Sequence, residues 1–291
     1  MVVEEATVFE CQGENLIGII HRPQVPEDVG VLVVVGGPQY RVGSHRQFLL
    51  LARYLADSGI AVMRFDYRGM GDSGGLLREF ETIDDDICAA IDHFSVAVPP
   101  VKRIVIWGLC DASSAALFYA HTDSRVAGLV LLNPWVRTAQ GEAEAYVKQY
   151  YVSRLANKAF WFKLLRGKVS LWEAYKSLFG NIWSMFFGNK TTREEGENGL
   201  GQASLPDRMF QGLRNFNGGV LIILSGKDLT ADEFKNLVSH SRAWQQQLKK
   251  KNVTVSELPE ANHTFSSHSL RHQVQLCTRD WLMAEYLVKT P

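Results

Sequence analysis

Hydrophobic and polar positions follow two rhythms along the chain. Short apolar, β-branched runs are typical of buried strands, and the stretches between them carry apolar residues every three or four positions, as amphipathic helices do. The expected strands are 16–21, 30–35, 61–66, 103–107, 128–132, 219–225 and 253–258. The expected helices are 45–58, 83–94, 112–121, 232–248 and 272–289. This succession indicates an α/β protein whose mostly parallel sheet has helices on both faces.

The rhythm breaks after Asn133. Residues 134–205 are rich in aromatic side chains and lack strand-like alternation, and they end in a polar, glycine-rich stretch. We therefore expect a core formed by 1–133 and 206–291, with 134–205 inserted as a helical cap.

Composition and charge exclude several partners. The 291 residues include 31 Lys and Arg against 31 Asp and Glu, so the net charge is zero and gives no basis for binding nucleic acid. The acidic N-terminus does not resemble a secretory signal, and no apolar run approaches the roughly 18 residues of a membrane span. The four cysteines lack C-x-x-C spacing, which favours free thiols in a reducing cytoplasm.

The segment around Cys110 joins a buried strand to a helix rich in small residues. Gly108 and Ala112 stand two positions before and after Cys110, as in a nucleophile elbow G-x-S-x-G with Cys for Ser and Ala for the last Gly. Such a turn strains its central residue, projects its side chain, and admits only small neighbours. The positive end of the helix favours a thiolate. The pattern therefore predicts Cys110 as a nucleophile and gives the other cysteines no catalytic role.

With this elbow, the chain resembles the α/β-hydrolase superfamily. The matching stretches, in order, are 33–40, 64–73, 108–112, 225–228 and 261–265. The resemblance covers nearly the whole chain except the insertion. It implies an α/β-hydrolase fold with a helical cap, and a nucleophile, an acid and a histidine in that order along the chain.

More narrowly, the chain resembles the exosortase A system-associated hydrolase 1 group. The stretches that carry this resemblance are Gly-Gly-Pro-Gln-Tyr-Arg-Val-Gly-Ser-His (36–45), Gly-Leu-Cys-Asp-Ala (108–112) and Gly-Lys-Asp-Leu-Thr-Ala (226–231). It implies a bacterial protein whose gene lies beside genes for exopolysaccharide production and protein sorting. Cysteine elbows also occur in dienelactone hydrolases, which are similar in motif only.

The superfamily order assigns a triad of Cys110, Asp228 and His263. His263 would take the Cys110 proton, hold the thiolate as an ion pair and later protonate the leaving group. Asp228 would fix the imidazole tautomer and stabilise the imidazolium. Asp232 is the alternative acid, although it also suits the start of the next helix. The alternative bases are two nearby histidines, His268 and His272.

An oxyanion formed on attack needs two backbone N–H donors. One should be the amide of Asp111, the residue after the nucleophile. The other should come from the loop at 36–39, where Pro38 has no N–H and the donor must be Gly37 or Gln39. Analogy with H-G-G-P-type loops favours Gly37.

Two basic residues follow this loop. Arg41 and His45 are candidates for binding an anionic substrate group. The alternative, which we favour, is a surface loop followed by a helix start capped by Ser44. Asp66 and Arg68, which lie in a glycine-rich stretch, are expected to form structural hydrogen bonds rather than a phosphate site.

These residues predict a hydrolase that acts on a small-molecule ester or thioester through an acyl-cysteine intermediate. The same site would serve an acyltransferase if another acceptor replaced water. The rival from a different class is a non-catalytic binding member of the fold, suggested by the doubly altered elbow. No H-E-x-x-H, Walker lysine or G-x-G-x-x-G motif is present, so we expect no metal and no cofactor.

Overall fold

The computed structural model describes residues 2–37, 39–136 and 203–287, and its described strands form one eight-stranded sheet. The strand order is β1-β2-β4-β3-β5-β6-β7-β8, in which the β1–β2 and β2–β4 pairs are antiparallel and the other five pairs are parallel. The strands are β1 (Val3–Cys11), β2 (Glu14–Arg22), β3 (Val29–Val34), β4 (Ala61–Phe65), β5 (Arg103–Leu109), β6 (Val126–Leu132), β7 (Gly219–Lys227) and β8 (Val253–Asn262). The predicted mostly parallel sheet is confirmed.

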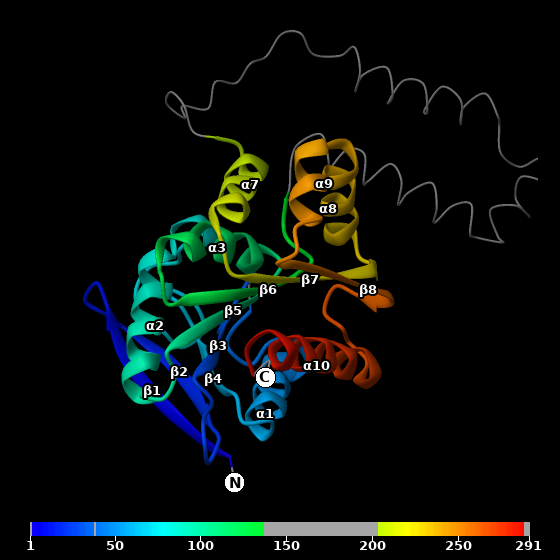
Figure 1. Cartoon of the computed structure of the whole chain (residues 1–291). Coiled ribbons are helices and arrows are strands. Elements are labelled where there is room, and N and C mark those ends of the chain that lie inside the picture. The colour runs from blue at the N-terminus through cyan, green and yellow to red at the C-terminus, as the bar shows by residue number, and fades with distance from the viewer. Residues whose placement is uncertain (1, 38, 137–202, 288–291) are drawn as a thin grey trace, which may run out of the picture. The chain divides into compact units, whose positions relative to one another are not determined.

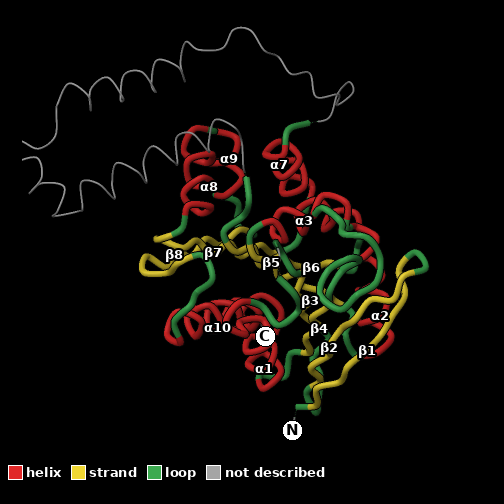
Figure 2. The backbone as a smooth tube through the Cα atoms, turned by 180° about the vertical axis from the view of Figure 1, so that it is seen from behind, coloured by secondary structure: helices red, strands yellow, loops and turns green. Residues whose placement is uncertain are grey.

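Helices cover both faces of this sheet (Figures 1 and 2). On one face lie α1 (Gln47–Asp57) and α10 (His268–Leu282). The opposite face is covered by five further helices, which are α2 (Asp84–Ala97), α3 (Asp111–Tyr119), α7 (Leu205–Asn215), α8 (Leu229–His240) and α9 (Arg242–Leu248).

The central strands are apolar on both faces because both faces are covered. In β3, Val31 and Val33 pack toward α1, while Leu32 and Val34 pack toward the opposite helices. All four side chains are fully buried. Each buried side chain of this kind stabilises the fold by about 1.5–3 kcal/mol. The continuous apolar run at 30–35 therefore reports a strand in the middle of the sheet.

Three elements differ from the sequence expectation. Strand β1 was not predicted, because most of its side chains are exposed and its alternation is weak. It pairs with β2 through the two-residue turn Gln12-Gly13, whose φ angles of 51° and 83° suit a type I′ hairpin. Helix α7 was also missed. The single helix expected at 232–248 is two helices, because Ser241 is extended and its side chain accepts from the Trp244 amide as the cap of α9.

Contacts divide the chain into two units, Met1–Gly141 with Leu205–Pro291, and Glu142–Ser204; the first contains the sheet. Val136 is buried in the core and α7 begins at Leu205. The core thus extends slightly into both ends of the range expected for the insertion. The rest of that range, 137–202, lies outside the described residues, so the helical cap stays a prediction. Among the described helices, none has the length and apolar character needed to cross a bilayer.

A buried histidine lies between β2 and β4. The His21 side chain is fully buried, and Arg64 Nε donates a hydrogen bond to its Nε2 at 3.0 Å. A ring nitrogen that accepts a hydrogen bond carries no proton, so His21 is neutral here. Burial, reinforced by the charge of Arg64 and opposed by Glu4, lowers the pKa of His21 to about 4.

We expect the free energy of unfolding to fall when the pH is lowered from 7 to 5. The unfolded chain binds a proton at His21 near pH 6.5 and the folded chain only near 4, which costs about 2 kcal/mol at pH 5. Urea unfolding at both pH values measures this loss. His21→Gln, which keeps an acceptor for Arg64, should remove most of it. An equal pH dependence in both proteins would contradict the assignment.

Candidate active site

The predicted site residues follow parallel strands, whose carboxyl ends lie along one edge of the sheet. Gly37 lies in the loop after β3, Cys110 follows β5, Asp228 follows β7 and His263 follows β8. The strands β3, β5, β6, β7 and β8 are successive parallel neighbours. Ligands bind at this edge in open α/β sheets.

Cys110 occupies the turn between β5 and α3. Its backbone has φ 64° and ψ −124°, a conformation that costs a non-glycine residue about 1–3 kcal/mol. Its amide donates to the Leu132 carbonyl at 2.8 Å, and its carbonyl accepts from the Ser113 amide at 3.0 Å. The neighbouring strand β6 and the first turn of α3 therefore hold the strained residue in place, with its side chain partly exposed.

Small residues let β5 and α3 pass each other at this turn. A Cβ on Gly108 would lie 2.7 Å from the carbonyl carbon and oxygen of Ala112, and backbone atoms cannot move aside easily. The Ser113 hydroxyl donates to the Gly108 carbonyl at 2.7 Å and accepts from the Leu132 amide at 3.1 Å. The spacing of Gly108 and Ala112 thus reflects the close approach that the elbow motif implies.

Asp228 caps α8 and contacts His263 with the same carboxylate. It accepts from the amides of Thr230 at 3.4 Å and Ala231 at 3.3 Å, and its Oδ2 lies 3.0 Å from His263 Nδ1. The side chain of Asp228 is 6% exposed and that of His263 is 34% exposed. The hydrogen bond to Asp228 raises the pKa of His263 against the opposing effect of burial. Because an ionised carboxylate only accepts, Nδ1 carries a proton and Nε2 is the basic nitrogen.

A buried network that the sequence analysis missed ties together the strands carrying this pair. Asn133, fully buried with φ 44°, donates from Nδ2 to Ser225 Oγ at 2.9 Å and accepts the Ser225 amide at 2.8 Å. The Ser225 hydroxyl then donates to the Asn262 carbonyl at 3.2 Å. The ends of β6, β7 and β8 are thereby held in register beside Asp228 and His263. A polar residue that ends an apolar strand run was the available signal.

The loop after β3 contacts the residue that follows Cys110. The Gly37 amide donates to Asp111 Oδ2 at 2.8 Å, with Gly37 at φ 59°. A Cβ on Gly36 would lie 2.2 Å from Asp111 Oδ1 and 2.6 Å from the Leu109 carbonyl oxygen, so only glycine fits there. The loop predicted to supply an oxyanion donor therefore lies beside the elbow, and its Gly37 amide points at a carboxylate.

Arg41 takes part in an internal ion-pair cluster. It contacts Asp66, and its Nη2 lies 2.7 Å from Asp72. Arg68 pairs with the fully buried Asp86 at 2.8 Å. Asp66 and Arg68 thus have the structural roles expected of them. The charge of Arg41 is balanced inside the protein, and a role in substrate binding stays a prediction.

Gln39 and His45, the other predicted site residues of this region, lie in the segment that leads to α1. Gln39 Oε1 accepts from the Ser44 amide at 3.1 Å. His45 is exposed in a short turn with φ 54°, and its role in substrate binding stays a prediction. Helix α1 begins at Gln47 and has no side-chain cap, so the expectation that Ser44 caps this helix is wrong. The positive φ of His45 and Arg46 separates Ser44 from the helix.

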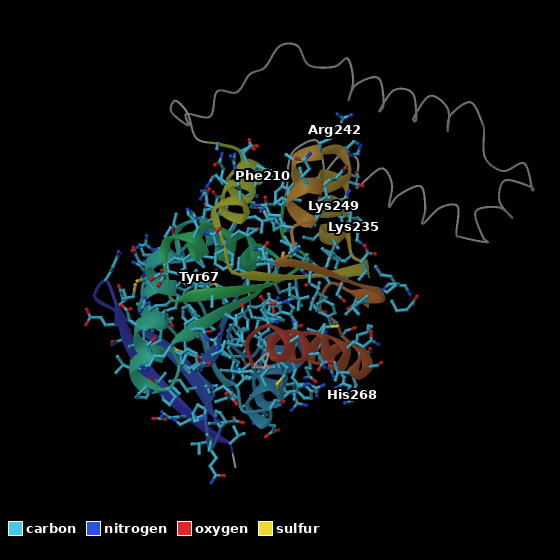
Figure 3. The ribbon with its side chains drawn as sticks, in the orientation of Figure 1. Tyr67, Phe210, Lys235, Arg242, Lys249 and His268 are labelled. Carbon is cyan, nitrogen blue, oxygen red and sulfur yellow. The ribbon has the colours of Figure 1, made fainter. Side chains whose placement is uncertain are left out.

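The alternative acid and bases lie elsewhere. Asp232 is inside α8, where its amide donates to the Asp228 carbonyl at 3.1 Å. His268 and His272 stack on each other along α10, with ring centroids 6.3 Å apart. Figure 3 shows His268 on the opposite side of the sheet from α8, where Lys235 is labelled. Asp228 is therefore the carboxylate that contacts His263 in this structure.

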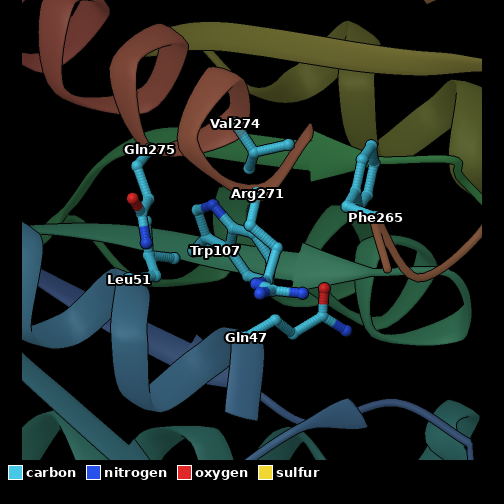
Figure 4. Close-up of a pocket in the computed structure, with 7 residues that line it drawn as sticks. All are labelled: Gln47, Leu51, Trp107, Phe265, Arg271, Val274 and Gln275. Atoms are coloured by element: carbon cyan, nitrogen blue, oxygen red, sulfur yellow. The ribbon is translucent and has the colours of Figure 1, made fainter. Parts of the chain in front are cut away.

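A small cavity lies on the α1 and α10 face of the sheet (Figure 4). Its lining residues are Gln47, Leu51, Trp107, Phe265, Arg271, Val274 and Gln275. Its volume of about 10 Å³ is that of a single water, so it is too small for an acyl substrate. Within the described parts of the chain, no cluster of three or more His, Cys, Asp or Glu side chains could hold a metal ion.

Comparison with known proteins agrees with this fold. A family model described as the alpha/beta hydrolase fold matches residues 31–266. The chain therefore belongs to the α/β-hydrolase fold family. Human Protein ABHD12B is 31% identical over 106 residues, and the uncharacterised protein PA2218 of Pseudomonas aeruginosa is 32% identical over 103. These alignments cover 35% and 34% of this chain and only 28% and 27% of the two relatives.

Similar solved structures cover almost the whole chain. The Pyrococcus furiosus esterase Pf2001 has a TM-score of 0.65 at 14% identity, over 98% of this chain and 93% of its own. Est1E from Butyrivibrio proteoclasticus, solved with ferulic acid, has a TM-score of 0.61 at 15% identity, over 96% and 99%. A dienelactone hydrolase from Anabaena variabilis has a TM-score of 0.61 at 14% identity, over 98% of both chains. At this identity the likeness establishes a shared fold.

We expect Asp228→Asn to lower the pKa of His263, because the hydrogen bond to the Asp228 carboxylate is what raises it. Asparagine is as good a helix cap as aspartate, so α8 should stay intact. Titration of the His263 ring signals by NMR measures the shift in both proteins. Asp232→Asn removes a carboxylate from the same helix and serves as the control. A larger shift in the Asp232 variant would make Asp232 the partner of His263.

Proposed function

We propose that the chain is a hydrolase that cleaves a small-molecule ester or thioester through a covalent acyl-cysteine. Cys110 is the nucleophile, His263 the general base and acid, and Asp228 the carboxylate that orients His263. The observation that carries the proposal is that Cys110 stands in a positive-φ turn at the head of α3, on the edge of the sheet where His263 Nδ1 lies 3.0 Å from Asp228.

Electrostatics support a short path between the elbow and the imidazole. His263 and Asp111 act on each other as charges, and each influences the pKa of the other. Asp111 follows Cys110 directly, which supports our placement of His263 beside the elbow. The amide end of α3 and a neighbouring imidazolium both stabilise a thiolate.

The reaction follows from these positions. The Cys110 sulfur forms a bond to the acyl carbon after its proton passes to His263. The bond from that carbon to the leaving oxygen or sulfur breaks, and His263 returns the proton to the leaving group. Water then attacks the thioester, giving one proton to His263. The carbon–sulfur bond breaks, the acid leaves, and the Cys110 thiol is restored.

Each tetrahedral intermediate carries an oxyanion that needs backbone donors. The Asp111 amide at the head of α3 is one candidate, and the Gly37 or Gln39 amide of the adjacent loop is the other. Removing one such donor in a comparable site costs about 10²–10³ in rate. The resemblance to the exosortase A system-associated hydrolase 1 group belongs to this proposal as well.

We expect an activated ester such as p-nitrophenyl acetate to leave an acetyl group on Cys110. Intact-mass and peptide mass spectrometry locate the adduct after a rapid acid quench. Cys110→Ala should abolish the adduct and reduce ester turnover by at least about 10³-fold, as loss of a covalent nucleophile does.

Cys277→Ala is the matched control, because Cys277 on α10 is a cysteine of intermediate burial, as Cys110 is. It should label and turn over like the unmodified protein. An adduct on another cysteine with Cys110 untouched would overturn the proposal. An adduct that forms on Cys110 but releases only to an added alcohol or amine would make the protein an acyltransferase. An inert Cys110 would favour the non-catalytic binding role.

A further inference from the structure

The carboxyl group of Asp111 accepts hydrogen bonds from two backbone amides beside the elbow. Its Oδ2 accepts the Gly37 amide at 2.8 Å and its Oδ1 accepts the Ala112 amide at 3.0 Å. Its own backbone amide also acts to lower the pKa of the carboxyl group. The amides of Gly37 and Asp111 are both candidate oxyanion donors. The side chain therefore already binds the Gly37 amide, one of the donors that the reaction intermediate would need.

The local packing is built around this side chain. Gly36 has no side chain where a Cβ would lie 2.2 Å from Asp111 Oδ1. Both carboxyl oxygens have backbone donors from different segments, the loop after β3 and the first turn of α3. The group is therefore held between two backbone segments and is not simply a solvated charge at a helix start.

We propose that Asp111 restrains the enzyme by occupying its own oxyanion hole, so that a substrate carbonyl must displace the carboxylate before Cys110 can be acylated. This inference rests on the proposed function. Two anions cannot share the same amides at hydrogen-bond distance, and the negative charge of Asp111 also opposes a developing oxyanion beside it. Asp111 thus contributes its amide to the reaction while its side chain competes with the intermediate.

The raised pKa of Asp111 is consistent with a carboxylate that a substrate can displace. Burial raises the pKa of Asp111 even though three amides and the charge of His263 act to lower it. The ionised carboxylate is therefore held at a cost that its movement toward water would relieve.

The test compares Asp111→Ala and Asp111→Asn with the unmodified protein in two reactions of Cys110. Acylation by p-nitrophenyl acetate passes through an oxyanion, whereas alkylation by iodoacetamide does not. We expect Cys110 of the Asp111→Ala variant to be acylated about tenfold faster or more, as release of a hydrogen bond to a charged group allows. The gain should appear in kcat. Asp111→Asn keeps a weaker, neutral acceptor and should gain less. Alkylation should change by less than about threefold in both variants, as expected if thiol ionisation is little altered.

Asp84→Asn is the matched control. Asp84 is the first residue of α2, as Asp111 is of α3, and it is an exposed carboxylate in the first helical turn. Its loss should leave both rates unchanged. Equal gains in acylation and alkylation would assign the effect to the thiol and overturn the proposal, and so would an unchanged or slower acylation in Asp111→Ala. If no protein in the set acylates Cys110, the proposed function itself fails.

Discussion

The close passage of α3 across the end of β5 is the constraint on which the rest of the site depends. Without a side chain at Gly108, the first turn of α3 lies against the strand, and Cys110 is left as the residue that must turn the chain. That turn costs backbone strain, which hydrogen bonds from β6 and α3 offset. The same geometry places Cys110 at the amide end of α3 and brings Asp111 against Gly37.

Polar contacts between strand ends fix the positions of the residues proposed to be catalytic. Asp228 contacts His263 and caps a helix with one carboxylate, so the proposed base is tied to a rigid element. Asn133 and Ser225 lock the strands on which these two residues depend. The restraint proposed for Asp111 also depends on a polar contact of this kind, because the backbone amides proposed to bind an oxyanion attract the nearest anion.

Much of this was predictable from the sequence, for physical reasons. Buried parallel strands need apolar residues on both faces, so β3 was evident, whereas β1 is exposed on most positions and leaves little pattern. Helix α7 follows a polar stretch and has only a short apolar stripe, with Met209 and Leu213 buried. The elbow was predictable because its steric demand fixes residue types at fixed spacing. The side-chain contact between Asp111 and Gly37 was not, since it depends on how two distant loops meet.

The rate at which iodoacetamide modifies Cys110, followed against pH, tests the central claim most directly. A Cys110–His263 ion pair predicts a thiol that still reacts at pH values well below the ordinary thiol pKa of about 8.5. It also predicts that His263→Ala abolishes this reactivity at low pH. The same pH curve in the presence and absence of the imidazole would contradict the account.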